Sequence, residues 1–213
     1  MAYYTKLRSE PDLQAASDAF HALFRHGLSC DQPVFHPGSG IILWGIRNEF
    51  SEEQFRILRE AALAEGDSEA YVSFIGDYQG GYREGNRLPA DFEISDHLRF
   101  NLELYPPRDF GEDWWHIVEH AIYSPRGAWG VMTSLEWHAV AVGSANFRAR
   151  LGVSPIFRDS LEGFLENWRD SRERLGGRTA WVPELLENVY GTAEADEIFA
   201  RFRQPREAWR RNG

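Results

Sequence analysis

The chain contains one cysteine, one lysine and no long apolar run, and each of these absences excludes a class of protein. The single cysteine, Cys30, excludes a disulfide within the chain and favours a reducing compartment. No apolar stretch approaches the roughly 20 residues that a transmembrane helix needs, and the first residues lack the apolar region of a signal peptide. We therefore expect a cytoplasmic protein that does not enter a membrane. All but Lys6 of the 23 basic side chains are arginine, which favours a GC-rich bacterial source.

Positive charge is also scarce, since 33 Asp and Glu residues outnumber 23 Lys and Arg residues and give a net charge of −10. Such a surface repels a phosphate backbone, which excludes nucleic-acid binding through a broad basic face. It suits a basic protein partner, because opposite charges steer association. The sequence also lacks a P-loop, a dinucleotide-binding glycine motif and the G-x-S-x-G turn of many hydrolases. We expect no cofactor, assign no catalytic residue and favour a non-enzymatic protein, while catalysis stays open.

Hydrophobic periodicity predicts one α+β domain over residues 1–213. Its sheet is mostly antiparallel, has five to seven strands and is covered by helices, with residues 152–213 as a helical C-terminal segment. The predicted strands are 2–8, 34–36, 41–46, 71–75, 97–105, 115–123, 129–134 and 137–143. The predicted helices are 11–26, 51–65, a short helix capped by Ser144, one that starts at Ser154 and Pro155, and two shorter ones after it. The last three strands are expected to form an antiparallel meander.

One pentapeptide, His116-Ile117-Val118-Glu119-His120, fits the H-x-x-E-H pattern and so resembles the zinc site of the inverzincin peptidases. That chemistry needs both histidines one helical turn apart on one face, with the glutamate as general base. The flanking β-branched and aromatic residues favour a strand instead. In a strand the glutamate and the histidines point to opposite sides. The pattern therefore predicts an extended segment over 115–123, in which the catalyst is not assembled.

The predicted sheet offers a second, weaker route to a metal. His116 and His120 fall in one strand, and His97 or His138 could join them from a neighbouring strand. Imidazole nitrogens from adjacent strands can hold a zinc ion when they share a face. A metal-assisted hydrolase that uses these histidines is therefore an alternative to a binding protein.

Acidic and aromatic residues adjoin one another just before this strand: Asp109, Glu112, Asp113, Trp114 and Trp115. Aromatic anchors surrounded by charged groups are typical of protein–protein contacts. We take these five residues as the candidate binding face for a basic protein. Residues 76–91 form a long polar stretch without periodicity, and loops of that length are often functional. That stretch would be a lid if the chain were a small-ligand binding module, the other alternative.

The stretch from His120 to Leu151 reads as a strand, a turn, two further strands and a short helix capped by Ser144. This arrangement resembles one met in small cytosolic bacterial proteins, including immunity proteins of toxin systems. The resemblance implies a protein that neutralises a toxin by binding it, and it carries no functional residue to a particular position. The sequence therefore predicts a protein-binding, immunity-like protein with a basic toxin as its partner. It does not predict the oligomeric state.

Overall fold

The computed structural model describes residues 4–24, 40–45, 50–75, 97–103, 119–134, 138–158, 160–175, 179 and 181–202. These residues form seven strands: β1 Tyr4–Lys6, β2 Gly40–Trp44, β3 Glu69–Ile75, β4 His97–Asn101, β5 Glu119–Tyr123, β6 Trp129–Ser134 and β7 His138–Gly143. They also form six helices: α1 Glu10–Leu23, α2 Glu52–Ala64, α3 Ala145–Gly152, α4 Ser160–Leu175, α5 Trp181–Tyr190 and α6 Thr192–Arg201. The α+β class predicted from the sequence is confirmed.

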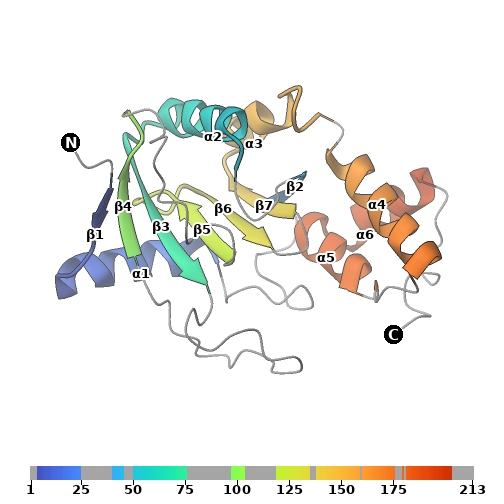
Figure 1. Ribbon diagram of the computed structural model, residues 1–213, viewed down its shortest axis with the longest axis horizontal. Coiled ribbons are helices and arrows are strands. Elements are labelled where there is room, and N and C mark those ends of the chain that lie inside the picture. The colour runs from blue at the N-terminus through green and yellow to red at the C-terminus, as the bar shows by residue number, and fades with distance from the viewer. Residues whose placement is uncertain are drawn as a thin grey trace.

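The seven strands form one sheet in the order β1-β4-β3-β5-β6-β7-β2, and every neighbouring pair is antiparallel. The predicted meander is present as β5, β6 and β7 (Figure 1). Ser124 and Gly127 make its first turn, where the Gly127 amide donates to the Ser124 carbonyl and Gly127 has a φ of +65°. A positive φ favours glycine, which explains the residue at this turn.

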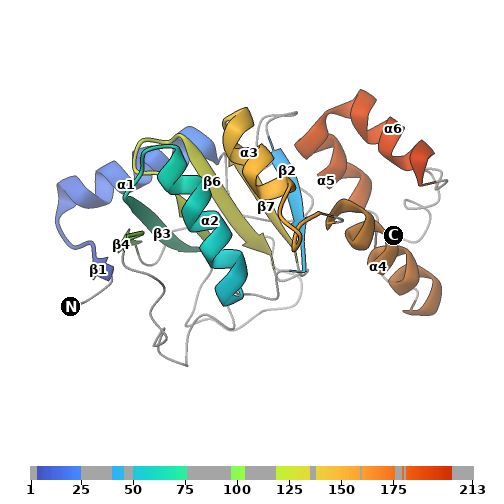
Figure 2. The ribbon, with the colours of Figure 1, turned by 90° about the horizontal axis from the view of Figure 1, so that it is seen from above.

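Two hydrophobic cores lie on opposite sides of the sheet. We call the side covered by α2 and α3 the two-helix face, and the side covered by α1 and α4–α6 the four-helix face. Figures 1 and 2 show α2 and α3 on one side of the sheet, α1 on the other, and α4–α6 gathered near β2. Because side chains alternate along a strand, β6 and β7 are buried on both sides and supply both cores.

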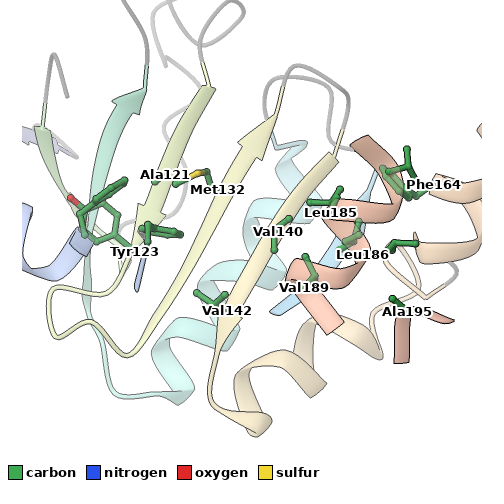
Figure 3. Packing of buried hydrophobic residues seen from close by; sticks show 14 of the residues in the cluster. Ala121, Tyr123, Met132, Val140, Val142, Phe164, Leu185, Leu186, Val189 and Ala195 are labelled. Carbon is green, nitrogen blue, oxygen red and sulfur yellow. The ribbon is translucent and has the colours of Figure 1, made fainter. Parts of the chain in front are cut away.

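The four-helix face joins the C-terminal helices to the sheet. Val140 and Val142 of β7 belong to one buried cluster with Leu185 and Val189 of α5 (Figure 3). Burial of an aliphatic side chain of this size contributes about 2 kcal/mol relative to leaving it in water. The segment α4–α6 is therefore held to the sheet by apolar packing.

Local signals explain where α2 and α3 begin. Ser51 and Gln54 form the predicted capping box of α2, in which each residue bonds the backbone amide of the other. Ser144 caps α3 as expected, accepting from the Phe147 amide at 3.0 Å. The prediction for α4 is wrong, because this helix begins at Ser160 rather than at Ser154. Two successive turns, Phe157 N to Ser154 O and Ser160 N to Phe157 O, occupy the intervening residues.

Candidate functional site

The candidate binding face lies outside the described residues. Asp109, Glu112, Asp113, Trp114 and Trp115 all belong to the range 104–118, as does His116. The stretch 76–91 also lies outside them. Residues 119–123 are extended as β5, in keeping with the strand predicted over 115–123. The five-residue face, the His116–His120 pair and the lid therefore stay predictions.

Three of the seven histidines lie at one end of the sheet, where β2, β3 and β6 finish and β4, β5 and β7 begin. We call this the histidine end. His97 starts β4 and pairs with Ser73, His120 is the second residue of β5, and His138 starts β7. The sequence prediction named these three residues together with His116, because all four fall in the predicted sheet.

His120 is fully buried on the two-helix face, the side to which Ile122 contributes. The Thr133 hydroxyl of β6 holds it in place through three contacts. It accepts from the His120 backbone amide at 3.1 Å, donates to the His120 carbonyl at 3.2 Å and lies 3.1 Å from Nδ1. A buried imidazole tied to its own backbone in this way is fixed in orientation. The arrangement is that of a structural histidine in a strand pair.

His138 is buried on the four-helix face within a group of aromatic rings. Its ring stacks on Trp181 of α5, with centroids 5.7 Å apart and planes 13° apart, and meets the edge of Phe164 of α4 at 5.3 Å. Trp168 of α4 packs against Trp181 at 4.9 Å in a T-shaped pair. Aromatic pairs at such distances add stability beyond the area they bury. His138 thus connects the sheet to α4 and α5.

The sheet itself separates His120 from His138. The two residues belong to strands on either side of β6, and their side chains enter different hydrophobic cores. The strands are about 10 Å apart, twice the spacing of neighbouring strands. The structure therefore does not bring these two imidazoles together. Among the residues it describes, no three His, Cys, Asp or Glu side chains form a group that could hold a metal ion.

The sequence prediction missed a buried carboxylate at the opposite end of the sheet. It links the residues before β3 to the β5–β6 turn and to β6. Asp67 is 6% exposed and uses both of its oxygens, accepting from Arg126 Nε at 2.7 Å and from Trp129 Nε1 at 2.8 Å. Arg126 also donates to the Glu65 carbonyl at 2.7 Å. The Glu65 carboxylate accepts from Ser144, the cap of α3, at 2.8 Å. No sequence spacing marks this set, because its members lie far apart along the chain.

Among the described side chains of α4–α6, most of the exposed charged ones are carboxylates. Exposed acids occur on all three helices: Glu162, Glu166, Glu184, Glu194, Asp196 and Glu197. The exposed basic side chain described on these helices is Arg201, while Arg169 is half-buried and lies 3.6 Å from Asp170. The connection between α3 and α4 also exposes two large apolar side chains, Val153 at 77% and Ile156 at 37%. The same connection exposes Arg158, so the negative charge of this region lies on α4–α6.

No protein-family model matches the chain, and neither a curated protein nor a solved structure is significantly similar to it. In the part of the chain that the structure describes, none of the helices has both the length and the apolar character needed to cross a bilayer.

Proposed function

We propose that this chain is a non-enzymatic, cytoplasmic bacterial protein that binds a basic protein partner, in the manner of an immunity protein that neutralises a toxin. The observation that carries the proposal is the excess of exposed carboxylates on α4–α6. The net charge of −10 extends the same field over the whole molecule. Charge of one sign on a binding surface raises the association rate with a partner of opposite sign and disfavours other partners.

The connection between α3 and α4 supports the same proposal. Val153 and Ile156 are the exposed large hydrophobic residues of the described chain, and they precede α4 directly. Protein interfaces combine a small apolar centre with a charged rim. We place the contact with the partner on this connection and on the exposed acids of α4–α6.

Binding to the product of the neighbouring gene tests the proposal. We expect the triple variant Glu166→Lys, Glu184→Lys and Glu197→Lys to weaken the complex about tenfold or more, chiefly through a slower association rate. Raising the salt concentration should weaken the complex of the unmodified chain and leave that of the variant much less affected. Surface plasmon resonance at two salt concentrations measures both effects.

A matched control carries the same change of net charge elsewhere. Asp18→Lys, Glu52→Lys and Glu103→Lys alter exposed acids on α1, on α2 and after β4. This control should change the affinity less than threefold. Equal loss in both triple variants would show that only the net charge matters and would remove the assignment to α4–α6. A basic neighbouring protein that does not bind the unmodified chain at all would overturn the proposed function.

The predicted face at 109–115 is tested separately with Trp114→Ala and Asp113→Arg. If this face contributes, the two changes weaken the complex even when α4–α6 is intact. Unchanged binding after these two substitutions would mean that the partner contacts α4–α6 and not the predicted face at 109–115.

A further inference from the structure

Among the residues that the structure describes, β2 is the last strand of the sheet on its side, and its composition makes it prone to further pairing. It is bonded to β7 and its sequence, Gly40-Ile41-Ile42-Leu43-Trp44, carries no charge. An edge strand presents unpaired amide and carbonyl groups to any extended segment that meets it. Uncharged, β-branched segments are the ones that pair most readily in this way.

A tyrosine of α5 occupies this edge. The Ile42 amide donates to the Tyr190 hydroxyl at 3.1 Å, so it does not point toward β7. In an antiparallel strand the amide and carbonyl of one residue point to the same side. The Ile42 carbonyl therefore also faces the outer edge. Burial raises the pKa of Tyr190 to about 12.

A close contact between α4 and β2 keeps the helices near this edge. A Cβ placed on Gly163 would lie 2.8 Å from Cδ1 of Trp44, so α4 approaches the strand as closely as glycine allows. The Trp44 ring also meets Phe164 of α4 at 6.1 Å. The glycine thus fixes α4, and with it the four-helix core that contains α5, against β2.

We propose that Tyr190 is an edge guard, whose hydroxyl takes the place of a strand carbonyl at Ile42 and prevents β2 of a second copy of this chain from pairing with β2. A second copy is the fitting occupant, because antiparallel pairing of two identical strands about Ile42 has two-fold symmetry. Each Ile42 would then exchange both of its backbone hydrogen bonds with its counterpart.

The test uses the full chain and three variants. Tyr190→Phe removes the acceptor and should make the Ile42 amide exchange with solvent about fivefold faster. It should also strengthen self-association about tenfold or more, as measured by analytical ultracentrifugation. Gly163→Leu displaces α4 from Trp44 and should act in the same direction. Adding Ile41→Lys to Tyr190→Phe places a charge on the partly exposed edge residue and should restore the monomer.

Tyr123→Phe is the matched control. It removes another buried tyrosine hydroxyl of the four-helix core, one bonded to Ser73 and to the Ala16 carbonyl, away from β2. It should leave the association state unchanged, and it should change the Ile42 exchange rate by no more than its loss of global stability accounts for. Unaltered exchange at Ile42 in Tyr190→Phe would overturn the proposal, as would dimers that persist after Ile41→Lys or form equally in Tyr123→Phe. None of these measurements involves the basic partner, so they stand or fall apart from the proposed function.

Discussion

The two faces of the sheet are built from the same strands but differ in the polar group that each of them buries. The two-helix face contains a charged group at its edge, where Asp67 binds Arg126 and Trp129. The buried side-chain contact of the four-helix face is neutral, with Tyr123 bonded to Ser73 and to the Ala16 carbonyl, and the ion pair on this face, Arg99 of β4 with Asp12 of α1 at 2.9 Å, is partly exposed. Charge-assisted hydrogen bonds are about twice as strong as neutral ones but are more sensitive to salt where they are exposed.

Two neighbours in β6 show how one strand serves both faces. Trp129 is fully buried and stacks on Phe147 of α3 at 5.2 Å, on the two-helix face. Gly130 faces the other way, and a Cβ there would lie 2.5 Å from Cζ of Phe24, which follows α1. The large ring of Trp129 therefore holds α3, whereas the absence of a side chain at Gly130 lets the end of α1 approach the strand closely. Alternation along a strand therefore lets adjacent residues meet opposite packing demands.

The largest expected effect comes from removing the ring that anchors the two-helix face. Trp129→Ala deletes a fully buried side chain and leaves Asp67 with one donor fewer. We expect it to lower the free energy of unfolding by about 4 kcal/mol, as for other buried Trp to Ala changes. Trp181→Ala is the comparison on the four-helix face, and it should cost less because Trp181 is half-buried. Urea unfolding of both variants measures the difference, and an equal or larger loss for Trp181→Ala would contradict it.

A smaller loss of folding stability is expected from removing the charged contact of Asp67 or the neutral contact of Tyr123. Asp67→Asn keeps the shape but removes the charge beside Arg126, which is 58% exposed, and should cost about 2 kcal/mol at low salt. Tyr123→Phe should cost about 1 kcal/mol. In 1 M NaCl the penalty of Asp67→Asn should shrink, whereas that of Tyr123→Phe should not change. Chemical unfolding at two salt concentrations checks this, and penalties that respond equally to salt would show that the two faces do not differ in this way.

Local patterns in the sequence predicted the elements better than their arrangement. The strand over 129–134 and the capping box at Ser51 are confirmed because each is written in consecutive residues. The positions of β1 beside β4 and of β2 beside β7 were not predictable, since such pairings depend on contacts between distant segments. The start of α4 was predicted too early, because Ser154 and Pro155 begin a pair of turns with the residue types of a helix cap.

The candidate sites were harder to predict, because they depend on which face each strand presents. His120 and His138 were recognised as sheet residues, but whether they share a face depends on the register across β6. A shift of one residue would have exchanged the faces. The Asp67 network could not be predicted from spacing, since it joins the start of β3 to the β5–β6 hairpin, about 60 positions later in the chain.

The smallest predicted effect is a loss of folding stability at alkaline pH, which should arise first on the four-helix face. Burial raises the pKa of Tyr190 to about 12 and also raises the pKa of Tyr123. Both residues belong to the four-helix core. Among the described residues, the buried cluster of the two-helix face contains no tyrosine. In the unfolded chain a tyrosine ionises near pH 10. The folded state therefore retains protons that the unfolded state has lost, so this contribution to stability is complete below pH 10 and decreases as the pH rises toward 12. We expect Tyr190 to account for a loss of about 1 kcal/mol between pH 9 and pH 11, which unfolding in urea at the two pH values measures. Tyr190→Phe should reduce this loss, and a loss that is the same with and without the hydroxyl would place the alkaline sensitivity elsewhere in the molecule.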